Sequence, residues 1–147
     1  MSNVTIREAT IDDAVHVAEL SGTLGYPVNV ETMRQRLERV LASNAHVVFV
    51  AEIDRQIVGW TEAAEVEILV ADRRCELEGL VVADGQRGHG VGRKLVEAVE
   101  QWARSRGLDQ ISLRSNVVRP ESHSFYERIG YERFKTQHAY RKVIRAT

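Results

Sequence analysis

Hydrophobic residues recur along this chain with two different periods, which divide it into strands and helices. Apolar side chains at every second position are typical of strands, and apolar side chains at every third or fourth position are typical of amphipathic helices. The alternating segments predict strands over residues 4–9, 46–52, 57–64, 74–82 and 110–114. The helical segments predict helices over residues 12–21, 31–42, 91–106 and 120–130.

Two further segments complete the pattern less regularly. Residues 65–71 alternate apolar and polar side chains, and they either extend the preceding strand or form a loop. Residues 131–144 predict one long or two short closing strands, broken near Gln137. The order is therefore β-α-α-β-β-β-α-β-α-β, which indicates a mixed sheet of the α+β or α/β class. No linker or repeat divides the chain, so we expect a single domain over residues 1–147.

A glycine-rich segment joins the apolar strand that ends at Val82 to the helix that begins at Val91. Its sequence is Arg87-Gly88-His89-Gly90-Val91-Gly92. The start of a helix presents unpaired backbone N–H groups and the positive end of the helix dipole. Glycines allow a sharp turn and the close approach of a ligand to the backbone. The segment is therefore a candidate anion site, most often one for phosphate.

Two common phosphate-binding motifs do not fit this segment. The dinucleotide motif G-x-G-x-x-G requires a glycine where this chain has Arg93 or, in the alternative register, Leu95. The nucleotide-triphosphate motif requires a lysine after Gly90, and Val91 stands there. A nucleotide-binding domain is therefore disfavoured.

A third motif, R-x-x-G-x-G, is matched by Arg87, Gly90 and Gly92. Together with Val82, this stretch resembles motif A of the GNAT superfamily of acyl-CoA-dependent N-acetyltransferases. The chain departs from the usual family pattern at Asp84, where a proline is common, and at Gln86, where an aromatic residue is common.

A second region strengthens the resemblance. Asn116, the run Ser122-x-x-Phe125-Tyr126 and the run Ile129-Gly130-Tyr131 are similar to the family signature N…A-x-x-F-Y-x-x-x-G-[FY]. Ser122 stands in place of the usual alanine. The two motifs are separated by a strand–helix–strand crossover of the right length, and residues 1–70 match by pattern only.

The resemblance implies a GNAT fold, with a mixed central sheet of 6–7 strands flanked by about four helices. It implies acetyl-CoA as cosubstrate, with the loop amides on its pyrophosphate and the pantetheine arm lying like an added strand between two splayed parallel strands. It also implies a β-bulge near Gly79 or Leu80. The coenzyme-binding residues would be Leu80, Val81, Val82, Arg87, Gly88, His89, Gly90, Val91, Gly92, Arg93, Asn116, Ser122 and Tyr126.

Acetyl transfer to an amine requires that the amine lose a proton and that the departing thiolate be stabilised. Glu78 is placed to act as the base, directly or through water, and Glu76 is the second candidate, although both glutamates also fit a solvated strand face. Tyr126 matches the usual general acid of the family. The resemblance implies direct transfer in a ternary complex, without a covalent enzyme intermediate.

The acceptor is the least determined part of the interpretation. Tyr26, Trp60 and Glu78 are candidate acceptor-binding residues, although core packing explains Trp60 equally well. A small amine suits the acidic residues of strand 74–82. The alternatives are an acetyltransferase that acts on a protein or peptide amine and a non-catalytic acyl-CoA-binding sensor.

Composition narrows the partners further. The chain has 147 residues, 44% of them hydrophobic and 28% charged, and its net charge is −1. A near-neutral chain is not expected to bind nucleic acid or an anionic membrane surface. Cys75 is the single cysteine, so no internal disulfide forms, and the histidines show no metal-ligand spacing. We expect a cytoplasmic protein without a metal, and the resemblance implies that a homodimer can form through the closing strands.

Overall fold

The structure is a computed structural model, which describes residues 3–23, 25–86, 89–115 and 120–145. The chain divides into two compact units, Met1–Arg114 and Ser115–Thr147, and each is described by itself. Within the described ranges, none of the helices combines the length and the apolar character that crossing a bilayer requires.

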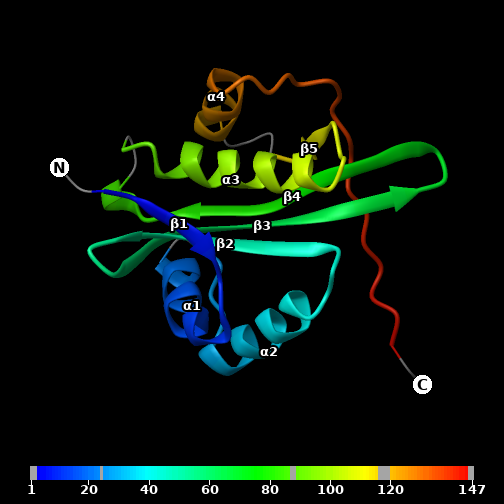
Figure 1. Ribbon diagram of the computed structural model, residues 1–147. Coiled ribbons are helices and arrows are strands. Elements are labelled where there is room, and N and C mark those ends of the chain that lie inside the picture. Colours follow the sequence, from blue (N-terminus) through cyan, green and yellow to red (C-terminus); the bar gives the residue numbers. More distant parts are fainter. Residues whose placement is uncertain (1–2, 24, 87–88, 116–119, 146–147) are drawn as a thin grey trace. The chain divides into compact units, whose positions relative to one another are not determined.

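The first unit is built on a five-stranded sheet in which neighbours along the chain are also neighbours in space (Figure 1). All pairs are antiparallel except β4–β5, which is parallel. The strands are β1 (Thr5–Glu8), β2 (His46–Ile53), β3 (Gln56–Ile68), β4 (Ala71–Val82) and β5 (Ile111–Leu113). The helical segments are η1 (Ile11–Asp13), α1 (Ala14–Thr23), α2 (Val30–Leu41), η2 (Asp84–Gln86) and α3 (Val91–Ser105).

Two helical layers cover the sheet, α1 and α2 on one face and α3 on the other (Figure 1). Because successive side chains of a strand point to opposite faces, β2 contributes to both layers. Val48 and Val50 pack beneath α1 and α2, whereas Val47 and Ala51 pack against α3. This double burial explains why β2 is almost continuously apolar.

Two connections between strands resolve local questions left by the pattern. The β2–β3 hairpin turns through Asp54 and Arg55, both with positive φ (51° and 66°), as a two-residue hairpin turn requires. The undecided segment 65–71 is mostly strand, because β3 continues to Ile68 and β4 begins at Ala71. The two strands of the β3–β4 hairpin thus extend beyond the predicted ranges 57–64 and 74–82.

Gly59 marks a close approach between the sheet and α3, as a glycine inside a strand often does. A Cβ at this position would lie 3.1 Å from Leu95 Cδ1 and 3.2 Å from Val91 Cγ1. The absence of a side chain lets the start of α3 pack directly on β3, beside the end of β4.

The predicted closing strands are the main difference in the fold. Among the described residues, 131–145 form no strand, so the sheet has five strands instead of the expected 6–7. A strand needs a backbone partner as well as an alternating pattern, and this segment makes no ladder. Phe134, Tyr140, Val143 and Ile144 are 69%, 93%, 64% and 88% exposed.

The described residues of the second unit include one helix, α4 (Pro120–Arg128), which confirms the predicted helix over 120–130 within two residues of its end. The backbone N–H of Gly130 donates to the Glu127 carbonyl, and Gly130 adopts a positive φ of 100°. A glycine in this conformation is the common way to end a helix.

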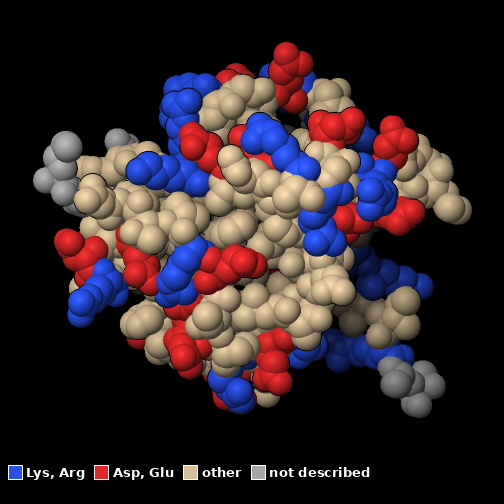
Figure 2. Space-filling view, viewed as in Figure 1, with Lys and Arg blue, Asp and Glu red and all other residues tan. Residues whose placement is uncertain are grey.

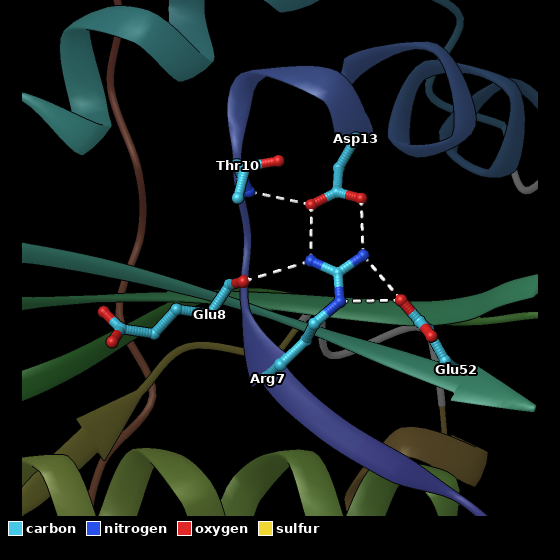
Figure 3. Close-up of polar contacts among 5 residues, drawn as sticks. All are labelled: Arg7, Glu8, Thr10, Asp13 and Glu52. Carbon is cyan, nitrogen blue, oxygen red and sulfur yellow. Dashed lines mark hydrogen bonds and ion pairs between the residues drawn. The ribbon is translucent and has the colours of Figure 1, made fainter. Parts of the chain in front are cut away.

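An ion-pair cluster joins β1, β2 and the end of η1 (Figure 3). The Arg7 guanidinium donates to both carboxylate oxygens of Asp13 at 2.8 Å and to Glu52 Oε1 at 2.6 Å. Asp13 Oδ2 also accepts the backbone N–H of Thr10 at 2.7 Å. These bonds, above all those from Arg7, hold the pKa of Asp13 below its usual 3.8. Asp13 is buried, so its carboxylate depends on these partners.

Replacing Asp13 with asparagine is expected to destabilise the fold by about 2 kcal/mol at neutral pH, the usual contribution of hydrogen bonds to a charged group. The pKa of Asp13 is lowered in the native state. Its contribution to stability is therefore complete above pH 3.8, the ordinary pKa of the group, and is lost as the pH falls through the lowered pKa. Urea unfolding across pH measures it, with the neighbouring exposed Asp12→Asn as control. If the difference in the free energy of unfolding between wild type and Asp13→Asn did not become smaller at acidic pH, this account would be contradicted.

Candidate functional site

A β-bulge interrupts the pairing of β3 with β4. Glu62 lies opposite Gly79 and Ala63 lies opposite Leu77, so Glu78 is the extra residue of β4. The buried Thr61 side chain donates to the Gly79 carbonyl at 2.6 Å beside the bulge. The bulge expected near Gly79 or Leu80 is confirmed, and it places Glu78 at the irregular position.

The far edge of β4 becomes open directly after the bulge begins. The parallel strand β5 pairs with β4 only at Cys75, Glu76 and Leu77. The coenzyme-binding candidates Leu80, Val81 and Val82 follow on β4, where no strand among the described residues of the first unit pairs with this edge. An extended ligand can add to such an edge through main-chain hydrogen bonds.

The helix that follows β4 begins at a left-handed glycine. Gly90 is the N-cap of α3, with φ 80° and ψ 8°. The first bond within this helix runs from the Lys94 N–H to the Gly90 carbonyl at 3.0 Å. The N–H groups of Val91, Gly92 and Arg93 precede that bond, so they face the end of the helix, as an anion site requires.

Other residues of the glycine-rich segment are placed less completely. Arg87 and Gly88 lie outside the described residues. The N–H of His89 points back to the Gln86 carbonyl at 3.4 Å. Val91 is only 1% exposed and packs in the core, so its side chain is not available to a ligand.

The two predicted catalytic glutamates occupy different environments. The Glu76 side chain is only 7% exposed and is an ion-pair partner of Arg74 at 3.2 Å and of Arg114 at 3.3 Å. Glu78 is exposed to solvent. Partial desolvation, together with the negative charges of Glu76 and Glu62, raises the pKa of Glu78. Glu78 is therefore the more accessible of the two glutamates, and its raised pKa makes it a stronger base than an ordinary glutamate carboxylate.

Glu62 adds a third carboxylate from the adjacent strand. It lies opposite Gly79 of β4, and its Oε2 is 3.3 Å from Nδ1 of His46 on β2. Sequence reasoning did not single out this pair, because the two residues are separated along the chain and only the β2–β3 register brings them together.

Trp60 lies between the first helical layer and the bulge. Its Nε1 donates to Ser21 Oγ of α1 at 3.1 Å, and its ring packs with the core beneath α1 and α2. A Cβ on Gly79 would lie 3.2 Å from two atoms of this ring. Core packing thus accounts for Trp60, and the same packing supports the bulge from beneath.

Tyr26 lies in the connection between α1 and α2. Its N–H donates to the Ser21 carbonyl at 2.9 Å, and its side chain is 53% exposed. Gly25 before it has a φ of 93°. The same helix end therefore supports both Tyr26, through its backbone, and Trp60, through the Ser21 hydroxyl.

The second unit carries the predicted general acid. Tyr126 of α4 makes edge-to-face contacts with Phe125 and Tyr131, with ring centroids 5.2 and 6.1 Å apart. Desolvation raises the pKa of Tyr126, which keeps its phenol protonated at neutral pH. Ser122 lies on the same helix and is partly buried, whereas Asn116 lies outside the described residues.

The part of the chain that the structure describes contains no group of three metal-ligating side chains. Cys75 is fully buried, and this burial raises the pKa of its thiol to about 11. A thiol with a raised pKa is a poor nucleophile. Cys75 is therefore a small core residue.

Comparison with known proteins identifies relatives over most of the chain. Residues 14–131 match the model of the acetyltransferase (GNAT) family. An aminoglycoside N(6')-acetyltransferase type 1 of Stenotrophomonas maltophilia is 32% identical over 133 residues, which cover 87% of this chain and 86% of that protein. An uncharacterized N-acetyltransferase, YhdJ of Bacillus subtilis, is 26% identical over 132 residues, 89% of this chain and 90% of that protein.

Solved structures share the fold. The aminoglycoside N-acetyltransferase AAC(6')-Iy in complex with CoA superimposes with a TM-score of 0.87 at 22% identity, over 97% of this chain and 96% of that chain. The same enzyme with a CoA-S-monomethyl-acetylneamine bisubstrate analog gives a TM-score of 0.86, over 97% and 100% of the two chains, also at 22% identity.

Replacing Gly79 with alanine is expected to disturb the bulge, because the new Cβ meets the Trp60 ring at 3.2 Å and the ring is held by Ser21. We expect a loss of about 1–3 kcal/mol of folding free energy, typical of overpacking, and weaker binding of coenzyme A. Urea unfolding and calorimetric titration measure these effects. Gly22→Ala, where no atom lies within 4 Å of the new Cβ, is the control. Unchanged affinity and stability in Gly79→Ala would show that this contact does not support the bulge.

Proposed function

Because this chain belongs to the GNAT acetyltransferase family and is an acetyl-CoA-dependent N-acetyltransferase, we propose that it acetylates a primary amine of a small cationic molecule by direct attack in a ternary complex. Residues 1–147 would form one such domain, since the family match crosses from the first unit into the second. The observation that carries the proposal is the bulge of β4, which sets the accessible Glu78 beside an open strand edge.

The donor site uses two backbone features of the first unit. The N–H groups at the start of α3 suit the pyrophosphate of acetyl-CoA, because unpaired amides and the helix dipole both favour an anion. The open edge of β4 at Leu80, Val81 and Val82 suits the amide groups of the pantetheine arm. We expect the reaction in the cytoplasm, where this donor is available.

The reaction requires two proton transfers, which we assign to Glu78 and Tyr126. The amine gives a proton to the Glu78 carboxylate, directly or through water, as its nitrogen bonds to the acetyl carbonyl carbon. The bond from that carbon to sulfur breaks, and the departing thiolate takes a proton from the Tyr126 phenol. Glu78 with a raised pKa is a stronger base, and Tyr126 with a raised pKa stays protonated until the thiolate forms.

A small cationic acceptor fits the charges around the bulge. Glu62 and Glu78 offer negative charge to an amine-bearing molecule, and the exposed Tyr26 offers an aromatic surface after α1. Figure 2 shows acidic and basic side chains interspersed over one face, without a large field of one sign for a polybasic protein tail. The name of the relative from Stenotrophomonas maltophilia also favours a small molecule with several amines.

Glu78→Gln and Tyr126→Phe test the catalytic assignments. With acetyl-CoA and a panel of small amines, polyamines, aminoglycosides and peptides, we expect the wild-type protein to release thiol with small cations. Glu78→Gln should lower kcat by about a hundredfold or more, the usual contribution of general-base catalysis. Tyr126→Phe should lower kcat far more than the affinity for acetyl-CoA, because the phenol acts on the leaving group.

Tyr140→Phe is the matched control, since Tyr140 is 93% exposed. Turnover of peptide acceptors alone would overturn the small-molecule assignment. Stabilisation by acetyl-CoA without turnover of any acceptor would favour the sensor function. Equal losses of kcat and acetyl-CoA affinity in Tyr126→Phe would contradict its assignment as the acid.

We also propose that two copies of the chain associate through residues 131–145. This segment has the alternating apolar pattern of a strand but makes no ladder within the described chain. Its exposed Phe134, Tyr140 and Val143 would be covered in a dimer, and its backbone, which makes no ladder within the described chain, would find a strand partner there.

Light scattering during gel filtration tests the dimer. The wild-type protein is expected at twice the chain mass, and Tyr140→Lys with Val143→Lys is expected to shift it toward the monomer because buried charges oppose association. Lys135→Glu on the same segment is the control for a change of charge. A wild-type monomer at high protein concentration would contradict the proposal.

A further inference from the structure

Glu76 is fixed in place at the point where β4 and β5 separate. It pairs with Ser112 in the middle of the three-residue parallel ladder, one residue before the last pair. Its Oε2 accepts from Arg74 Nη2 at 3.2 Å and from Ser112 Oγ at 3.4 Å, and its Oε1 lies 3.3 Å from Arg114 Nη1. Because these three groups hold a side chain that is 7% exposed, this carboxylate is neither mobile nor open to an amine.

Arg74 in turn is anchored to both strands. Its Nε donates to Ser112 Oγ of β5 at 3.1 Å while its Nη2 donates to Glu76. The two arginines and the Ser112 hydroxyl surround this buried carboxylate, as a carboxylate in a desolvated position requires. Glu76 therefore presents its charge at a fixed place.

Glu78 lies two residues farther along β4, at the bulge, with its side chain exposed. Charged groups from every neighbouring element act on it. Partial desolvation raises its pKa, and Glu76 of β4 and Glu62 of β3 raise it further, whereas Arg114 after β5 and His46 of β2 lower it. The net effect raises the pKa of Glu78, so its carboxylate binds a proton more tightly than that of an isolated glutamate.

We propose that Glu76 is a positioning residue whose fixed negative charge strengthens Glu78 as the general base, and that Arg114 moderates this effect. The inference rests on the proposed function, in which Glu78 takes the proton of the acceptor amine. The two neighbouring carboxylates, Glu76 and Glu78, thereby have different roles in the reaction because their surroundings differ. Glu76 is closed by its arginine partners and supplies only its charge, while Glu78 is open and accepts the proton.

The test measures the titration of Glu78 directly, without a substrate. Carboxyl carbon NMR of the full chain follows each glutamate with pH, and Glu78→Gln identifies the signal of Glu78 by its loss. In Glu76→Gln, the midpoint of the Glu78 titration is expected to move to lower pH, because a negative charge that raises the pKa of Glu78 has been removed. In Arg114→Gln, the midpoint is expected to move to higher pH, because a positive charge that lowers the pKa of Glu78 has been removed.

Midpoint shifts in opposite directions in Glu76→Gln and Arg114→Gln distinguish an electrostatic role of these residues from a structural one. Arg114 is 77% exposed, so its removal leaves the fold intact and keeps the test informative if Glu76→Gln unfolds. Glu76→Asp retains the charge and is expected to keep the midpoint of the wild type. Arg73→Gln is the matched control, since Arg73 makes a comparable ion pair with Glu65 on the same hairpin, at 2.8 Å. It is expected to leave the midpoint unchanged.

The pH profile of kcat/KM, with neamine as the first acceptor, then connects the titration to catalysis. Its acid limb is expected to shift with the Glu78 midpoint in each variant and to disappear in Glu78→Gln. Unmoved midpoints in Glu76→Gln and Arg114→Gln would overturn the inference while leaving Glu78 as the base. Moved midpoints with full activity in Glu78→Gln would instead overturn the proposed function, and the catalytic meaning of Glu76 with it.

Discussion

The parallel pairing of β4 with β5 lasts for three residue pairs and then stops, and the candidate site depends on this limit. Up to Leu77 the two strands are joined by backbone bonds and by the Arg74–Glu76–Ser112 contacts. Beyond it, the bulge at Glu78 changes the register of β4, and the strand continues to Val82 with an open edge. An open edge inside a covered sheet is costly unless something binds there, so this is where a ligand with peptide-like groups gains most.

The packing of the first unit keeps that junction rigid. Gly59 lets α3 lie close to β3 and the end of β4, which brings the start of α3 near the strand that precedes it. From the other face, the Trp60 ring lies against Gly79 and is held by α1 through Ser21. The bulge is therefore supported by the core on one side and remains accessible at Glu78, which suits a site that must hold its geometry during group transfer.

Family membership and local chemistry answer different questions about this chain. The family model and the 32% identical relative establish an acetyl-CoA-dependent N-acetyltransferase. The solved structures, at 22% identity, establish the shared fold. The proposed division of labour between Glu76 and Glu78 comes from neither source. It follows from the ion pairs and exposure of two residues that look alike in the sequence.

The sequence by itself determined the order of strands and helices up to α4, the glycine-rich start of α3 and the family, because these depend on local periodicity and on short motifs. It also predicted the bulge, since an apolar run after Gly79 does not fit a regular strand. Only the tertiary structure decided that Glu76 is enclosed and Glu78 open, that Trp60 packs beneath the bulge, and that residues 131–145 make no ladder. Hydrophobic alternation reports which face a side chain prefers, but strand pairing and ion pairing depend on partners that are distant along the chain.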